Sequence, residues 1–190
     1  MKEDARIIRT KRDLANALEE LLQERKFDDL SIKDITDKAL ISKNTFYNNF
    51  HDKNELLTFL FNRYKDELLT NILPLFEKIT VLTRKLFFRI IIENIIKSFY
   101  ESKIPFKQLI LNDTSHTLYF FITKYISDTI NEVDKSNKFL ISKKSQTKIT
   151  STFFAGAFAS TIYFCVTENK EISAKEMTDS IVKLTSSLVS

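Results

Sequence analysis

Apolar residues in the first fifty positions recur every three or four residues, which is the spacing of one face of an amphipathic helix. Leu14, Leu18 and Leu21 show this spacing, and the charged residues nearby fall at other positions. Thr10, Ser31 and Ser42 each stand just before such a pattern, where a hydroxyl side chain can cap a helix N-terminus. The sequence therefore predicts three helices, over about 10–25, 31–38 and 42–49.

Longer apolar patterns fill the rest of the chain. Asp52, with Glu55 at the capping-box position, begins a helix that we expect to end near Asn71, because Pro74 cannot donate an amide hydrogen. Pro105 interrupts the apolar segment 75–100, and Ser173 with Glu176 forms another capping box. After the first three helices the sequence predicts helices over about 52–71, 75–100, 106–111, 115–134, 143–167 and 173–188.

These patterns predict an all-α fold of about nine helices. Strand-like alternation does not persist, and no repeat of 20 to 50 residues is visible. The 190 residues include one Gly and two Pro, so few positions favour tight turns. Within the segment 75–100, Arg89 and Glu93 have the i, i+4 spacing of a helical ion pair.

The segment Ile149–Thr167 has no charged residue and approaches the length of a membrane span. Its many Ser, Thr and Ala residues make it only moderately apolar, so we interpret it as a buried or interface helix and expect no membrane association. The N-terminus shows no secretory signal, and the single Cys165 lies among apolar neighbours. These features favour a cytoplasmic protein.

Overall charge does not identify a nucleic-acid-binding half. The chain has a net charge of +4, but residues 1–57 contain eleven Lys and Arg against twelve Asp and Glu. Residues 1–12 alone are basic, with five Lys and Arg against two acidic residues. They are compatible with a basic arm for DNA and with a solvated tail.

Enzyme chemistry finds little support in the sequence. The chain has two histidines, too few glycines for a phosphate-binding loop, and no cluster of His, Cys or carboxylates at metal-ligand spacing. We therefore expect a protein that is not an enzyme and that has no cofactor and no metal.

Two short helices joined by a turn of a few residues are the geometry of a helix-turn-helix, whose second helix enters the DNA major groove. Here that second helix is 42–49. If Phe46 and Phe50 face the core, the polar residues between and before them lie on the outer side. Such groups can contact base edges or phosphates.

The same region resembles the N-terminal domain of the TetR/AcrR family of transcriptional regulators. The resemblance covers Thr10–Leu57 and rests on five linked segments: helix 1 ending in Phe27, Ser31–Ile35, Ala39–Ser42, Thr45–Phe50 and Asp52–Leu57. It implies that 1–57 is a DNA-binding domain, that the fourth helix is a connector to about residue 71, and that 72–190 is a helical dimerisation and effector domain.

The resemblance also implies a role for individual polar residues. Base or phosphate contacts with double-stranded DNA are expected from Ser31, Lys33, Ser42, Lys43, Asn44, Thr45, Tyr47, Asn48, His51 and Lys53. Each also has a plainer interpretation: Tyr47 as a half-buried aromatic, Lys43 and Lys53 as surface lysines, and His51 as a capping or packing residue. Two departures from the family pattern stand out, because Leu40 and Lys26 occupy positions where glycine is usual.

The resemblance implies a homodimer and an effector-binding pocket in the second domain. For the dimer interface we expect Phe153, Ala157, Phe158, Ile162, Ile181, Leu184 and Leu188. For an aromatic pocket we expect Phe99, Tyr100, Phe106, His116, Tyr119, Phe120 and Tyr125, although these side chains are equally compatible with a filled core. The partner of such a domain is a small apolar or aromatic ligand or a protein coactivator.

The predicted function is that of a DNA-binding transcriptional regulator, a repressor that binds a palindromic operator as a homodimer and is relieved or modulated by an effector. The alternative is a helical dimer of the same fold that acts through a protein partner, as a coactivator-dependent activator or an interaction protein. The negative charge of residues 1–57 and the unusual Leu40 favour that alternative.

Overall fold

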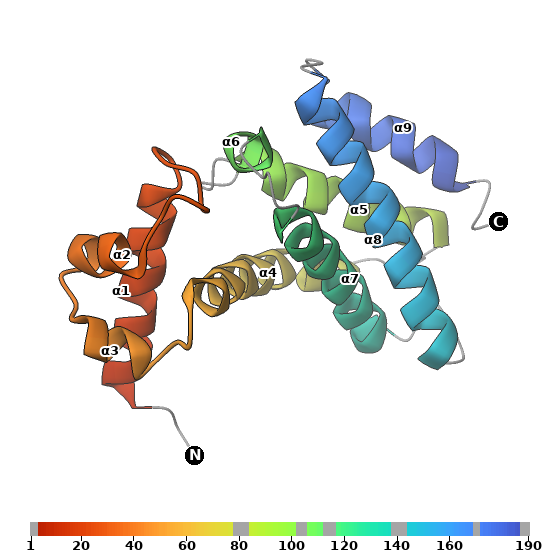
Figure 1. Cartoon of the computed structure of the whole chain (residues 1–190). Helices are drawn as coiled ribbons and strands as arrows, with labels where there is room; N and C mark the ends of the chain where they lie inside the picture. The colour runs from red at the N-terminus through yellow and green to blue at the C-terminus, as the bar shows by residue number, and fades with distance from the viewer. Residues whose placement is uncertain are drawn as a thin grey trace.

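The structure is a computed structural model, and it describes residues 4–77, 84–101, 106–111, 117–137, 144–168 and 172–186. These residues form helices and short connections, with no strand among them, which confirms the predicted all-α class (Figure 1). The helices in the described ranges are α1 (Ala5–Leu21), α2 (Ile32–Ala39), α3 (Lys43–Tyr47), α4 (Lys53–Glu77), α5 (Arg84–Glu101), α6 (Phe106–Leu111), α7 (Thr117–Asn137), α8 (Lys144–Thr167) and α9 (Ala174–Ser186).

Helices α1, α2 and α3 gather at one end of the molecule, and α4 leads from them into the larger helical group (Figure 1). Leu14 and Leu18 of α1 are fully buried, as are Ile35 of α2 and Phe46 of α3. Because α1 packs against both α2 and α4, the apolar faces predicted from the sequence converge on one small core.

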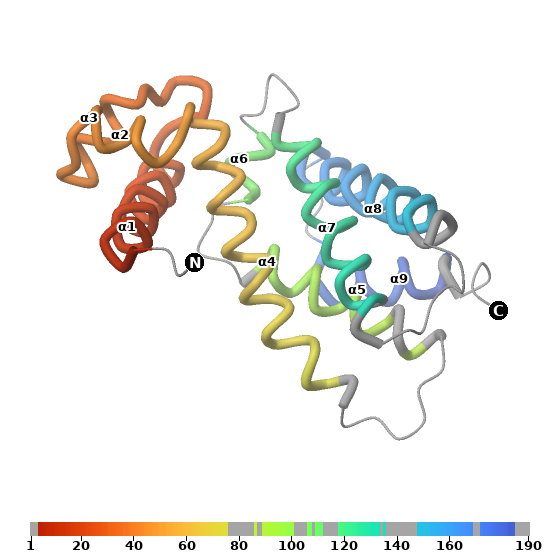
Figure 2. The backbone as a smooth tube through the Cα atoms, turned by 90° about the horizontal axis from the view of Figure 1, so that it is seen from below, coloured from red at the N-terminus to blue at the C-terminus, as the bar shows by residue number. Residues whose placement is uncertain are grey.

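The second group forms around α7, which packs along α8 on one side and against α4 on the other (Figure 2). Helix α5 packs against α9, and α6 packs against α7 and α8. Isoleucines fill much of this core: Ile91, Ile92, Ile95, Ile96, Ile122, Ile126 and Ile130 are all buried. Helix α4 belongs to both groups, so the boundaries 1–57 and 72–190 stay a prediction.

Several helix ends differ from the prediction, among them both ends of α1, which finishes at Leu21 instead of about residue 25, and the end of α4. Helix α1 begins at Ala5, not near Thr10, because the Asp4 carboxylate accepts a hydrogen bond from the Arg6 amide and caps the helix there. The basic residues from Arg6 onward are therefore helical. Helix α4 runs through Pro74 to Glu77, so the predicted end near Asn71 is wrong.

Arg89 and Glu93 have a spacing that allows an ion pair, but Arg89 pairs with a residue of another helix. Arg89 Nη2 instead lies 2.9 Å from Asp179 Oδ1 and joins α5 to α9. Helical spacing makes a local pair possible, but a tertiary neighbour competes for the same guanidinium.

Helix α8 carries the segment that resembles a membrane span. Lys148–Thr167 is long and apolar enough to cross a membrane by length and composition, with a mean hydropathy of 1.5. A core or interface helix of a helical bundle passes the same test, and Ala155, Phe158 and Ala159 of α8 are buried in the bundle.

Candidate nucleic-acid interface

The beginning of α2 is fixed by a capping box. The Ser31 hydroxyl accepts a hydrogen bond from the Asp34 amide, and the Asp34 carboxylate accepts one from the Ser31 amide at 2.8 Å. Arg25 pairs with the same carboxylate at 3.0 Å. Hydrogen bonds from Ser31, with support from Arg25, hold the pKa of Asp34 well below its usual value. Ser31 thus has a structural role at the place where a phosphate contact is predicted.

Helix α2 ends in a left-handed residue that is not glycine. Leu40 has φ 56° and ψ 39°, and it is the only non-glycine residue with positive φ in the described part of the chain. The turn is closed by hydrogen bonds from the Leu40 amide to Asp37 O and from the Ile41 amide to Thr36 O. This conformation costs about 1–2 kcal/mol for a residue with a Cβ. Lys26, the other position where glycine is usual in the family, does not have a positive φ.

Helix α3 begins at the predicted cap. The Ser42 hydroxyl accepts a hydrogen bond from the Thr45 amide at 3.1 Å, and it lies 2.8 Å from the Thr45 hydroxyl. Phe46 is fully buried, while Tyr47 is 57% exposed. The predicted outward side is thus confirmed for the exposed residues Lys43, Asn44, Tyr47 and Asn48, and Thr45 is half-buried.

Aromatic contacts fix α3 against the rest of the domain. The Phe46 ring lies 5.9 Å from the Phe50 ring, and Phe50 makes an edge contact with Phe59 of α4 at 5.5 Å. Tyr47 leans its ring against the edge of Phe46 at 5.6 Å, so its orientation is restricted although it is exposed. An exposed but oriented aromatic hydroxyl is suited to a phosphate or base contact.

Two predicted DNA contacts, one at the beginning of α4 and one just before it, have different surroundings. His51 is exposed, and its amide donates to Glu55 Oε2 at 2.6 Å. The Lys53 ammonium donates to the carbonyls of Phe27, Asp28 and Leu30 at 2.9 to 3.1 Å, and lies over the Phe27 ring. These three bonds use all the protons of the ammonium, so Lys53 closes the loop between α1 and α2.

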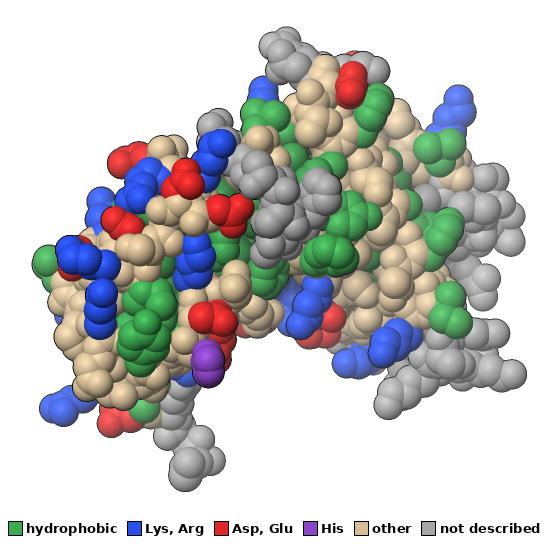
Figure 3. Space-filling model, viewed as in Figure 1, with side chains coloured by type: hydrophobic (Ala, Val, Ile, Leu, Met, Phe, Trp, Pro, Cys, Tyr) green, Lys and Arg blue, Asp and Glu red, His purple; other side chains and the backbone are tan. Residues whose placement is uncertain are grey.

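Charges of both signs are mixed over the α1–α3 end of the molecule (Figure 3). Lys33 pairs with Asp37, and Lys38 pairs with Glu20 at 2.9 Å; each partner carboxylate, through a hydrogen bond and its charge, raises the pKa of its lysine. Lys43 forms no ion pair with the described residues, and it stands at the beginning of α3.

Sequence reasoning missed Asn49. Its side-chain amide donates a hydrogen bond to Thr45 O at 2.7 Å and so stabilises the end of α3.

The aromatic residues predicted for an effector pocket separate into two groups. Phe99, Phe106 and Tyr125 are buried together with Phe61, with the Phe99 and Phe106 rings 4.4 Å apart, so these three fill the core. Tyr100 and Phe120 are exposed, and Tyr119 lies 3.1 Å from the Ser160 hydroxyl. Burial raises the pKa of Tyr125 to about 12. His116 lies outside the described residues.

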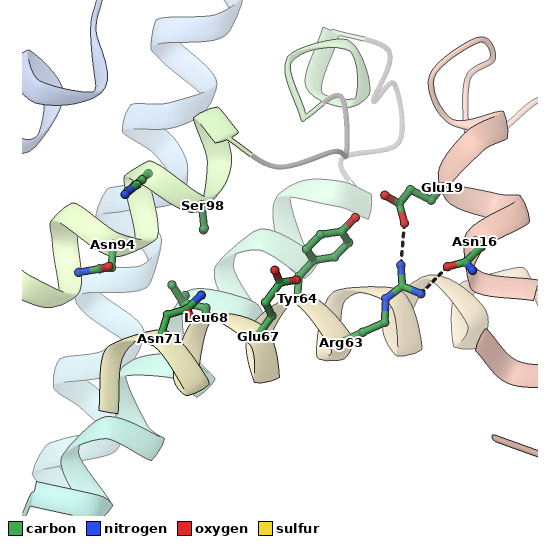
Figure 4. Close-up of a pocket in the computed structure, with 10 residues that line it drawn as sticks. Asn16, Glu19, Arg63, Tyr64, Glu67, Leu68, Asn71, Asn94 and Ser98 are labelled. Carbon is green, nitrogen blue, oxygen red and sulfur yellow. Dashed lines mark hydrogen bonds and ion pairs between the residues drawn. The ribbon is translucent and has the colours of Figure 1, made fainter. Parts of the chain in front are cut away.

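A polar cavity of about 690 Å³ lies elsewhere, between α1, α4 and α5 (Figure 4). Arg63 of α4 points across it to α1, where its guanidinium donates to Asn16 Oδ1 at 2.7 Å and to Glu19 Oε2 at 2.6 Å. Burial and a hydrogen bond to Glu19 raise the pKa of Tyr64 above its usual value. The remaining lining includes Glu67, Asn71, Asn94, Lys97 and Ser98.

The residues predicted for the dimer interface also fall into two groups, exposed and buried. Phe153, Ala157 and Leu184 are exposed, whereas Phe158, Ile162 and Ile181 are buried in the core of the monomer. Leu188 lies outside the described residues. Ile149 and Phe164, which the prediction omitted, are exposed on α8 with Phe153 and Ala157. We call Ile149, Phe153, Ala157 and Phe164 the α8 stripe.

The fold and the exposed polar helix α3 define an all-α protein with a helix-turn-helix, the class that inserts one helix into the major groove. Residues 11–58 match the family model for bacterial regulatory proteins of the tetR family. Residues 11–58 are therefore similar to the DNA-binding domain of TetR-family transcriptional regulators. The match to a regulatory family agrees with the prediction that the protein is not an enzyme.

Solved structures support the fold over the whole chain. Lin0861 from Listeria innocua is 20% identical, with a TM-score of 0.68 over 99% of this chain and 95% of that chain. The TetR family repressor AlkX from Dietzia sp. strain DQ12-45-1b, implicated in biodegradation of n-alkanes, is 13% identical, with a TM-score of 0.65 over 94% of both chains.

The dihydroxyacetone kinase operon activator DhaS is 17% identical, with a TM-score of 0.61 over 96% of this chain and 97% of that chain. Similar folds thus occur in a repressor and in an activator. No match was found among curated protein sequences.

Proposed function

We propose that this protein is a homodimeric repressor that binds a palindromic DNA operator through α3 and is modulated by an effector. The observation that carries the proposal is the construction of α3, whose buried Phe46 anchors a helix that presents Lys43, Asn44 and Tyr47 to solvent. Polar side chains on a firmly packed helix can be placed accurately against base edges.

Within this proposal, base contacts come from the first turn of α3 and phosphate contacts from its flanks. Ser42, Lys43, Asn44 and Thr45 meet base edges, and Tyr47, Asn48 and His51 meet phosphates. Ser31 and Lys33 approach a second phosphate at the beginning of α2, where the helix N-terminus favours an anion. Lys53 is left out, because its protons are committed to the α1–α2 loop.

The dimer is proposed to form through the α8 stripe and Leu184 of α9. Large exposed apolar side chains on one helical face favour burial against a second copy. A Cβ added at Gly156 would meet no atom within 4 Å, so the fold of the monomer does not require glycine there. Two-fold symmetry would then set the two α3 helices one DNA turn apart, about 34 Å.

Effector binding is supported by the polar cavity between α1, α4 and α5. A ligand there would touch α1 of the DNA-binding domain and α5 of the second domain. The affinity of the protein for the ligand would then depend on how the two domains are placed relative to each other. If DNA binding changes the ligand affinity by some factor, the ligand changes the DNA affinity by the same factor. The lining favours a polar molecule over the apolar or aromatic ligand first expected.

Fluorescence anisotropy on DNA from upstream of the protein's own gene, at several salt concentrations and against scrambled DNA, tests the central proposal. Six to ten phosphate contacts predict an affinity loss of about 10³ to 10⁵ between roughly 50 and 200 mM salt. Selective and salt-dependent binding is the expected result. If sites selected from random DNA also fail to bind selectively, the protein-partner alternative replaces the DNA-binding proposal.

A further inference from the structure

The turn between α2 and α3 contains an unusual combination of features. Leu40 adopts the left-handed conformation that glycine or asparagine adopts most easily, and its side chain is 93% exposed. The two hydrogen bonds that close the turn use backbone atoms only. Glycine or asparagine could make the same turn, so the turn itself does not account for leucine.

Packing does not account for leucine either. In a core, the free energy gained by burying an apolar side chain often offsets the strain of its backbone. The Leu40 side chain is 93% exposed, so it buries almost no apolar area. Every other apolar residue from Ile32 to Phe50 is at least half-buried except Tyr47, which is itself a predicted DNA contact. Strained residues of this kind concentrate at binding sites, where the strain serves the ligand.

The position of Leu40 in the fold indicates what kind of ligand its side chain could contact. It stands two residues before Ser42, the N-cap of α3, so its Cα lies within about 7 Å of the Ser42 Cα. The N-terminal end of the recognition helix is the end that contacts base edges in a helix-turn-helix. An exposed leucine two residues before that end would lie near the DNA if the helix enters the major groove.

In the major groove, the apolar group available to a leucine is the 5-methyl group of thymine. We propose that Leu40 is a specificity-determining residue that packs against a thymine methyl group at the edge of each operator half-site. This inference rests on the proposed DNA-binding function. It assigns an apolar contact to a turn whose closing hydrogen bonds use backbone atoms only.

Two substitutions separate the strain from the contact. Leu40→Gly removes both, and Leu40→Asn keeps a side chain that tolerates the left-handed conformation but replaces the apolar surface with an amide. We expect both variants to melt about 2–4 °C higher than the wild type, because the strain is relieved. We expect both to bind the operator about 5- to 10-fold more weakly, because the contact is lost.

The decisive experiment pairs Leu40→Gly with operators in which single thymines are replaced by uracil, which lacks only the methyl group. The DNA is the site that the wild-type protein selects from random sequence, and affinity is measured by anisotropy. At one symmetric position, uracil should weaken the wild type about 5- to 10-fold and leave the Leu40→Gly variant unaffected. Lys124→Ala on α7, away from the turn, is the matched control and should keep the full uracil effect.

The possible outcomes lead to different conclusions. Equal operator affinity of Leu40→Gly and wild type overturns the proposal, and so does a loss of affinity that no uracil position shares. A wild-type protein that selects no DNA sequence overturns the DNA-binding function itself, which is a separate result.

Discussion

Tyr47 combines exposure with a fixed orientation, because its ring leans against the buried Phe46. We predict that Tyr47→Ala lowers operator affinity about 10-fold or more without unfolding the protein, since the hydroxyl contact is lost and the anchor Phe46 is kept. Anisotropy measures the affinity, and circular dichroism checks the fold. A folded variant with unchanged affinity would remove Tyr47 from the interface.

Asp34 shows how acid affects the helix-turn-helix. Its pKa is lowered in the folded protein, chiefly by hydrogen bonds from Ser31, so its contribution to stability is complete above the unfolded pKa near 4 and is lost as the pH falls below it. We predict that Asp34→Asn is less stable than the wild type at pH 7 and that this difference shrinks between about pH 5 and pH 2. Urea unfolding at several pH values measures it, and a difference independent of pH would contradict the interpretation.

Among the elements, α1 and α4 are joined by an ion pair that water reaches only partly. Arg63 contacts Glu19 at 2.6 Å, and the Glu19 side chain is 11% exposed. Arg63→Met would leave that carboxylate without its cationic partner, so we predict a loss of about 1–3 kcal/mol in the free energy of unfolding.

Denaturant unfolding tests the prediction on Arg63. The double variant Glu19→Gln with Arg63→Met serves as the control, because it removes the stranded charge and should regain part of the loss. A single variant as stable as the wild type would show that the pair contributes nothing to the attachment of α1.

Helix beginnings could be predicted from the sequence where a cap is local. Ser31, Ser42 and Ser173 all lie at the helix N-termini expected from their side chains. Thr10 failed as a cap because Asp4, six residues earlier, caps first and the helix continues through Thr10. Pro74 failed as a terminator: α4 continues through it to Glu77 without the one helical hydrogen bond that Pro74 cannot donate.

The candidate site was predictable only in part, for a physical reason. The outward side of α3 follows from helical spacing alone, so its exposed residues could be identified. The roles of Lys53 and Arg89 depend on partners 23 or more residues away, which no local pattern specifies. The aromatic residues near α6 have the composition of both a pocket and a core, and only packing distinguishes the two.

At the scale of the whole molecule, the α8 stripe is the dimer interface that we propose. We predict that Ala157→Arg yields monomers, because a long charged side chain would have to be desolvated between two apolar faces. Sedimentation equilibrium measures the mass, with Thr70→Arg on the exposed side of α4 as the matched control. An intact Ala157→Arg dimer would place the interface elsewhere.

The α8 stripe also bears on how sharply a gene could respond to the amount of this protein. When most chains are single, the concentration of pairs follows the square of the chain concentration, so halving the supply lowers the supply of pairs about fourfold. If each operator half-site binds one α3, as we propose, single chains would occupy the operator poorly. The exposed Phe153 and Phe164 side chains would thereby make operator occupancy change more steeply with the concentration of the protein than the DNA contacts alone would.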